Sequence, residues 1–246
     1  MRMKNDLYLG LESGGEGFSL ALVSNGQNCG ELLIGSPQRQ LVHLFPALKN
    51  WMHESEFAFS QIKGVGVALG PGGYTGLRLG LITAKTLAQV LQVPMRGMNS
   101  LDLLAHNFLP ASGLVLPLTD ARKKEIYTAV YRAENGKIER LSDYWAIPPE
   151  ALAEKLTSYR EPLALLGGGC RVYREALEQT LGAKALFLPP AFDHPRALFL
   201  ALETEREILA GRGSAYAEIG PFYLRPPDAV LPKIPELKLK LRSETP

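Results

Sequence analysis

Residues 67–88 read VALGPGGYTGLRLGLITAKTLA, in which a short apolar run, a glycine-rich loop and a helical pattern follow one another. Strand, glycine loop and helix in this order are typical of loops that bind phosphate groups. The spacing fits neither common form, because the lysine of a P-loop and the third glycine of the dinucleotide fingerprint are both missing. We therefore expect at most a contact with an anion or a nucleotide phosphate, made by Gly72, Gly73, Thr75 and, from a later turn, Asp120.

The helix that follows, expected from about residue 76 to residue 91, carries small residues on one face. They recur at every fourth position: Gly76, Gly80, Ala84 and Ala88. A glycine inside a helix costs about 1 kcal/mol relative to alanine, so this pattern needs a reason. Small residues at this spacing let another backbone approach closely. The small face would accept a helix of the same chain or of a partner, while the neighbouring apolar row would face the chain's own sheet (Leu77, Leu81, Leu87 and Val90).

A second amphipathic helix is expected over residues 40–53. Its apolar residues recur with helical spacing at Leu41, Leu44, Phe45, Leu48 and Met52. Pro46 lies inside this helix and predicts a kink. Strands are expected around the two helices, at residues 7–11, 18–23, 31–34 and 65–69.

After Pro110 the pattern starts again. Strands are expected at residues 114–118, 125–132 and 163–166, and helices at 149–159, 171–181 and 195–210, the last of them capped by Asp193. Both halves begin with strands and end with helices, so the predicted fold class is a two-lobed α/β fold built by duplication. The N-terminal lobe would span residues 1–109 and the C-terminal lobe residues 110–246, ending in a proline-rich, mobile tail.

The composition is that of a globular chain, with 246 residues, a net charge of +2 and 46% hydrophobic residues. No segment approaches the ~18 consecutive apolar residues of a membrane span, and the N-terminus has no apolar signal region. Cys29 and Cys170 match neither a disulfide framework nor a metal site. These features predict a cytoplasmic protein without membrane contact, and the near-neutral charge predicts no broad basic face for nucleic acid.

Residues suited to catalysis are few. His53 begins a sequence like the H-E-x-x-H zinc motif, but Phe57 stands in the place of the second histidine, and no G-x-S-x-G nucleophile elbow occurs. We therefore predict no catalytic residue and no metal site. Glu12 and Asp120, two acidic residues in turns, keep an ATP-dependent kinase or ATPase open as an alternative. A peptidase has less support, because it would need the missing nucleophile or metal ligands.

Four segments together resemble one known family. Residues 70–80, GPGGYTGLRLG, closely resemble the glycine signature of the TsaB (YeaZ) family of bacterial tRNA threonylcarbamoyladenosine biosynthesis proteins. Residues 41–46, 119–127 and 221–225 resemble the family's helix with an internal proline, its D-A-R-x-x-E-V-Y segment and its P-x-Y-L-R segment. The first strand departs from the pattern, because this chain has Leu11, Glu12, Ser13 and Gly14 where the family's strand ends in D-T-S.

The resemblance implies the actin-like ATPase (ASKHA) fold, with duplicated mixed-sheet domains. It also implies a subunit that is not the catalyst: it binds the catalytic subunit TsaD and works with the ATPase TsaE to transfer a threonylcarbamoyl group to the adenosine beside the anticodon of tRNA. Such a subunit would reach tRNA through the complex, form a homodimer when alone, and leave any ATP or ADP to the assembled complex. The expected partner interface combines both helices: Leu41, Leu44, Phe45, Leu48, Gly76, Gly80, Ala84 and Ala88.

Overall fold

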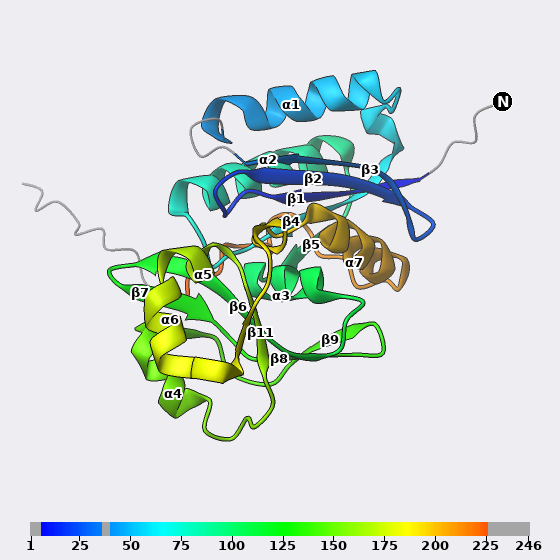
Figure 1. The fold of residues 1–246 in the computed structure, drawn as a ribbon. Coiled ribbons are helices and arrows are strands. Elements are labelled where there is room, and N and C mark those ends of the chain that lie inside the picture. The colour runs from blue at the N-terminus through cyan, green and yellow to red at the C-terminus, as the bar shows by residue number, and fades with distance from the viewer. Residues whose placement is uncertain (1–5, 36–39, 226–246) are drawn as a thin grey trace, which may run out of the picture.

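Two mixed β-sheets form the cores of two lobes (Figure 1). The computed structural model describes residues 6–35 and 40–225, apart from the side chains of residues 40–42, so the predicted tail lies outside the described residues. The first sheet has the order β3-β2-β1-β4-β5. Its central strand, β1, runs antiparallel to β2 and parallel to β4. The strands are β1 (Leu7–Glu12), β2 (Phe18–Ser24), β3 (Gln27–Ile34), β4 (Ile62–Ala68) and β5 (Met95–Met98).

The second sheet repeats this arrangement around a central strand, β6 (Gly113–Arg122). On one side lie the parallel strands β11 (Leu163–Leu166) and β12 (Ala185–Phe187). On the other side, two antiparallel pairs take the place of two long strands: β7 (Glu125–Thr128) with β10 (Trp145–Ile147), and β8 (Tyr131–Glu134) with β9 (Lys137–Arg140). Strand order and directions match the first sheet, which confirms the predicted duplicated two-lobed α/β fold.

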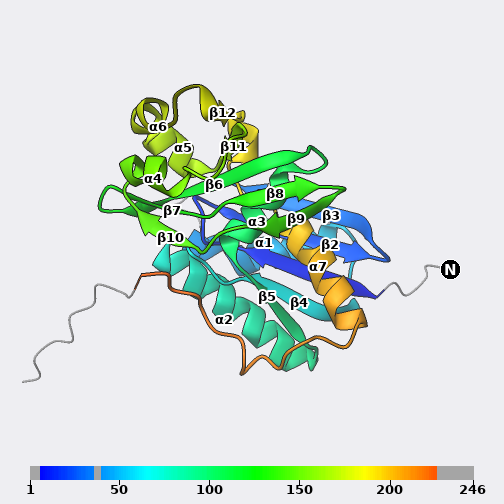
Figure 2. The same ribbon diagram turned by 90° about the horizontal axis from the view of Figure 1, so that it is seen from below.

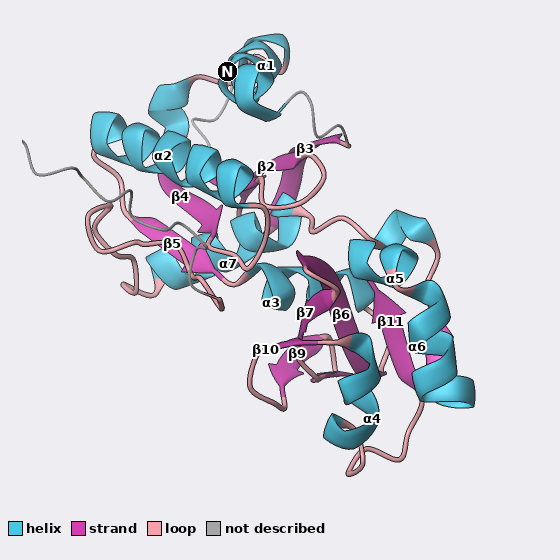
Figure 3. Ribbon diagram, turned by 90° about the vertical axis from the view of Figure 1, so that its left-hand side faces the viewer, coloured by secondary structure: helices cyan, strands magenta, loops and turns pink. Residues whose placement is uncertain are grey.

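Helices α1 (Gln40–Glu54) and α2 (Tyr74–Leu91) cover one face of the first sheet, and α7 (Ala197–Leu209) covers the other (Figure 1, Figure 2). The predicted division near residue 110 does separate the two sheets. The predicted C-terminal lobe of residues 110–246 is nevertheless wrong for helix α7, because this helix packs on β1, β2 and β4 of the first lobe. Helix α3 (Ser100–Ala105) lies between the lobes (Figure 3).

The remaining helices of the second lobe are shorter than the sequence predicts: α4 (Leu152–Lys155), α5 (Gly168–Val172) and α6 (Arg174–Leu181). The prediction that Asp193 caps the last long helix is wrong. Asp193 Oδ1 instead accepts a hydrogen bond from Gly167 N at 2.9 Å. The first amide of α7, that of Ala197, donates to Ser19 Oγ of β2 at 2.9 Å. The helix start is therefore satisfied by a hydroxyl group far away in the sequence.

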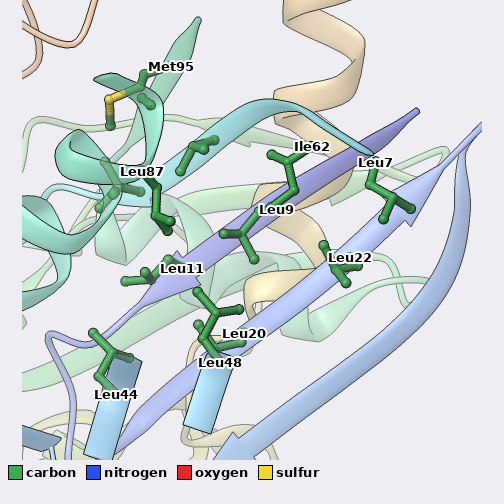
Figure 4. Close-up of a cluster of buried hydrophobic side chains, with 14 of the residues drawn as sticks. Leu7, Leu9, Leu11, Leu20, Leu22, Leu44, Leu48, Ile62, Leu87 and Met95 are labelled. Atoms are coloured by element: carbon green, nitrogen blue, oxygen red, sulfur yellow. The ribbon is translucent and has the colours of Figure 1, made fainter. Parts of the chain in front are cut away.

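Leucine side chains fill the space between the first sheet and the helices α1 and α2 (Figure 4). Alternate residues of β1 point into this core, namely Leu7, Leu9 and Leu11, because successive side chains of a strand face opposite sides. From α1, Leu44 and Leu48 meet them. Each such side chain stabilises the fold by about 1.5–3 kcal/mol when fully buried.

The opposite face of β1 and β4 carries glycine beneath α7. A Cβ atom on Gly10 would lie 2.4 Å from the carbonyl oxygen of Ala197 and 2.9 Å from the amide of Ala201. A Cβ atom on Gly66 would lie 2.1 Å from Thr204 Oγ1. The helix backbone therefore approaches the sheet more closely than any larger residue would permit.

We expect Gly10→Ala to lower the free energy of unfolding by about 3 kcal/mol, at the upper end of the usual cost of overpacking, because its methyl group meets backbone atoms of α7. Urea unfolding monitored by circular dichroism measures this change. Gly220→Ala is the matched control, since nothing lies within 4 Å of its added Cβ atom, and its effect is expected within about 0.5 kcal/mol. Equal stability of the two variants would contradict this account of the packing.

Candidate functional site

A cavity of about 750 Å³ lies between the two lobes. Its walls are the turn after β1, the glycine-rich loop before α2, the end of β6, the start of α5 and the segment before α7. All four residues predicted to contact an anion line this cavity: Gly72, Gly73, Thr75 and Asp120. The structure thus brings the loop and the later turn together, while binding of an anion stays a prediction.

Glu12, the last residue of β1, lines the cavity although its residue is only 3% exposed. Its Oε1 atom accepts a hydrogen bond from Gly14 N at 2.6 Å. Burial raises the pKa of the Glu12 carboxyl group from 4.5 to about 7, although hydrogen bonds from the backbone of Gly14 and Gly15 act to lower it. The carboxyl group therefore changes its charge near neutral pH.

The glycines before α2 allow a direct contact with the turn after β1. Gly73 N donates to the carbonyl oxygen of Gly14 at 2.8 Å, and Ser13 Oγ donates to the carbonyl oxygen of Gly76 at 2.8 Å. A Cβ atom on Gly72 would lie 2.6 Å from the same oxygen of Gly14. The glycine-rich loop is thus required for packing of two backbone segments, whatever else it binds.

Asp120 stands on the second lobe and is held by its neighbours. Its Oδ1 atom accepts hydrogen bonds from the hydroxyl group of Tyr173 at 2.9 Å and from Arg122 N at 2.8 Å. Arg122 Nη1 lies 3.1 Å from Asp120 Oδ2. The turn predicted at these residues begins later, because β6 continues to Arg122 and φ is positive at Arg122, Lys123 and Lys124.

A C-terminal segment, which the sequence analysis did not connect with the cavity, forms hydrogen bonds to both lobes. We call residues 221–225 the C-terminal strap. Phe222 N donates to the carbonyl oxygen of Leu69 in the first lobe at 2.8 Å. Arg225 Nη1 donates to Glu125 Oε2 in the second lobe at 2.7 Å. The aromatic and basic residues of the strap were visible in the sequence, but these two partners are distant in the chain.

The structure corrects the predicted role of the small residues on α2. All four are buried within the chain, where α2 packs on β4, β1 and α1: Gly76, Gly80, Ala84 and Ala88. A Cβ atom on Gly80 would lie 2.1 Å from Ser13 Oγ and 2.9 Å from Leu11 Cδ2. The lane that we expected for another helix is therefore filled by β1 and the turn after it. Val90, which was expected to face the sheet, is 74% exposed.

The apolar face of α1 is also used within the chain. Leu44 and Leu48 are buried in the core, so they cannot contact a partner as we expected. The side chain of Leu41 lies outside the described residues. Phe45 is the member of this set that faces outward, being 48% exposed and stacked on Phe59 at a ring distance of 6.4 Å.

Exposed apolar side chains remain on the outer surfaces of α1 and α2. Ile82 is 64% exposed, and it joins Phe45 and Val90 in what we call the apolar outer face. The sequence analysis missed Ile82, because it considered only the small stripe and the row beside it. The i, i+8 spacing of Ile82 and Val90, which falls within one broad apolar stripe of a helix, was the available signal.

Among residues 6–35 and 40–225, no group of three histidine, cysteine, aspartate or glutamate side chains could hold a metal ion. Within the same part of the chain, the helices are too short or too polar to cross a membrane.

Two lobes with matching mixed sheets and a cavity between them define a protein of the actin-like ATPase fold, as predicted. A family model described as TsaD, tRNA N6-adenosine threonylcarbamoyltransferase, matches residues 38–214. Because this match covers more than half of the sequence, the chain belongs to that family.

Within the family, relatives of similar length are TsaB proteins, which confirms the resemblance seen in the sequence. The tRNA threonylcarbamoyladenosine biosynthesis protein TsaB from Bacillus subtilis is 29% identical over 218 residues, covering 88% of this chain and 93% of the relative. The structure of YeaZ from Pseudomonas aeruginosa matches with a TM-score of 0.77 at 24% identity, over 89% of this chain and 100% of the other. A tRNA N6-adenosine threonylcarbamoyltransferase from Desulfitobacterium hafniense is 27% identical, over 65% of this chain and 45% of its own.

We expect Glu12 to make the stability of the chain depend on pH. Its pKa is higher in the folded chain (about 7) than the ordinary value of 4.5, so folding favours its protonated form. Its contribution is fully present below pH 4.5 and is lost as the pH rises to about 7, by roughly 3 kcal/mol. Glu12→Gln cannot titrate. The difference in free energy of unfolding between wild type and this variant should therefore shift by that amount, and a difference independent of pH would contradict the assignment.

Proposed function

We propose that the chain is a non-catalytic scaffold subunit of the complex that transfers a threonylcarbamoyl group to the adenosine beside the anticodon of tRNA. It would act by binding a TsaD-type catalytic subunit. Membership of the family and the names of the TsaB relatives support a place in tRNA threonylcarbamoyladenosine biosynthesis. The observation that carries the scaffold role is the apolar outer face, which leaves large apolar side chains without cover.

The apolar outer face has the properties of a docking surface. Ile82 and Val90 lie on the same side of α2, and Phe45 lies on α1, which packs beside α2. Fully burying one such side chain contributes about 1.5–3 kcal/mol. Apolar groups gathered on one surface mark sites of association. Without its partner, the same face would close a symmetric homodimer of the chain.

A partner related in fold suits this surface. The threonylcarbamoyltransferase from Desulfitobacterium hafniense aligns with 65% of this chain, so it shares a large part of the same architecture. Two related lobes can pair through equivalent helices, as in a pseudo-symmetric dimer. We further propose that a TsaE-like ATPase is the third component of the complex and that ATP or ADP binds in the assembled complex. The chain would contact tRNA only through this complex, in the cytoplasm.

Complementation tests the proposed process directly. Bacterial cells depleted of their own TsaB should regain threonylcarbamoyladenosine in their tRNA when they express this chain, as measured by mass spectrometry of digested tRNA. Expression of the folded chain without recovery of the modified nucleoside, together with no binding to the host TsaD, would refute the proposal.

Ile82→Glu combined with Val90→Glu should weaken binding to a TsaD-type subunit by more than 100-fold, because charged groups would be buried without partners at the contact. The dissociation constant from calorimetry measures the effect. The stability of the chain alone should stay within about 0.5 kcal/mol, since both side chains are exposed.

Leu186→Glu is the matched control. Leu186 is 53% exposed on the second lobe, so its change should leave binding unaltered. Ala84→Glu serves a different purpose: Ala84 is buried in the chain's own core, so this variant should unfold the chain. Wild-type affinity in the double variant would show that the interface lies elsewhere.

A further inference from the structure

The actin-like ATPase fold implies a nucleotide whose phosphate groups lie against turns of the cavity between the lobes. In this chain, Glu12 occupies the turn after β1 in a way that the proposed scaffold role does not explain. We propose that the Glu12 carboxyl group stands in for a phosphate group, so that this turn fastens β1 to the start of α2 and does not hold the phosphates of ATP.

The backbone amides of the turn are already in use. Successive N–H groups of a turn that point to one place bind an anion. Gly14 N donates to Glu12 Oε1 at 2.6 Å, and the backbone of Gly15 also bonds to this carboxyl group. Since Glu12 is only 3% exposed, a phosphate group could reach these amides only if the carboxyl group moved away.

The space beside the turn is filled as well. The carbonyl oxygen of Gly14 accepts a hydrogen bond from Gly73 N at 2.8 Å, so the turn rests directly on the loop before α2. A Cβ atom on Gly14 would lie 2.6 Å from Leu77 Cδ2, which shows that the other side of the turn touches α2 itself. A phosphate group could therefore reach the turn only on the side that the Glu12 carboxyl group occupies.

The second lobe does not supply the metal–phosphate site that ATP needs. A Mg²⁺ ion is held by carboxylate oxygens and by the phosphates themselves. Asp120 and Asp193 both line the cavity. The hydroxyl group of Tyr173 and the amide of Arg122 occupy Asp120 Oδ1, and the Arg122 guanidinium lies 3.1 Å from its Oδ2 atom. Asp193 Oδ1 accepts a hydrogen bond from Gly167 N, and its Oδ2 atom lies 2.9 Å from Arg171 Nε. The residues present therefore do not fit a magnesium nucleotide.

The contact between the turn after β1 and the start of α2 also affects the apolar outer face. This last step rests on the proposed function. Fastening the turn to Gly73 and Gly76 fixes the start of α2, and α2 carries Ile82 and Val90 of the apolar outer face. An interface that is already ordered loses less conformational entropy when a partner binds. Glu12 would thus serve docking through the position of α2.

Binding of pyrophosphate and of Mg²⁺-ATP to the chain alone tests the proposal. At pH 8, wild type should give no calorimetric signal and no shift in melting temperature with either probe at about 1 mM. Glu12→Ala should bind pyrophosphate and melt at a temperature about 3 °C higher when the probe is present. Glu16→Ala is the control, because Glu16 also lines the cavity but is exposed, and it should behave like wild type.

Each outcome is decisive. Wild-type binding of Mg²⁺-ATP that is lost in Glu12→Ala would overturn the proposal, because Glu12 would then be a ligand-binding residue. Absence of binding in both proteins would also overturn it, because Glu12 would not be the group that closes the turn. If circular dichroism shows that Glu12→Ala does not fold, Glu12→Ser replaces it with a small polar residue. The assay uses the chain without partners, so its result is independent of complementation and of TsaD binding.

Discussion

The backbone contact between the turn after β1 and the start of α2 is the constraint on which the rest of the structure depends. Two glycine-rich segments meet there, with Gly73 N bonded to the carbonyl oxygen of Gly14. The contact sets the height of α2 above β1, so a residue without a side chain is needed where Ser13 and Leu11 meet the helix at Gly80. Once that side is fixed by packing, Ile82 and Val90 must face outward. The glycine loop and the apolar outer face are thus two results of one packing arrangement.

The two lobes are joined by more than the chain that runs between the sheets. Helix α7 follows the second sheet in sequence but packs on the first, where glycine in β1 and β4 lets its backbone approach. The C-terminal strap then bonds to both lobes, and Tyr223 of the strap stacks on Tyr74 of α2 at a ring distance of 5.7 Å. Opening the cavity would therefore disturb the same helix that carries the apolar outer face. This coupling favours a fixed arrangement of the lobes.

Local patterns sufficed to predict the central strands of both sheets, the two helices of the first lobe and the duplication, because alternation and helical spacing report burial directly. They missed the short strands β5, β9, β10 and β12 and joined β7 and β8 into one strand. The pattern on α2 showed correctly that another segment comes close, but the atoms that meet Gly80 belong to side chains and not to a backbone. The pattern could not show which segment, because Ser13 and Leu11 meet Gly80 only after β1 and α2 pack. The same limit applies to Asp193, which binds Gly167 N, and to the strap: both depend on partners far away in sequence. Four cavity residues were nevertheless found, since glycine loops and acidic turns are themselves local signals.

The acidic groups Glu12 and Asp120 of the cavity are bonded within the chain, although Thr119 Oγ1, which also lines the cavity, has no hydrogen-bond partner among the described residues. A cavity that serves a charged ligand keeps donors and carboxylates available, whereas here Glu12 and Asp120 are both bonded to neighbouring groups of the chain. A surface that serves only folding covers its large apolar side chains, whereas Phe45, Ile82 and Val90 remain exposed. An uncovered apolar group gains free energy when a partner buries it, and a satisfied polar group gains little from a ligand. This difference is the physical reason why the proposed scaffold role assigns binding to the outer surfaces of α1 and α2.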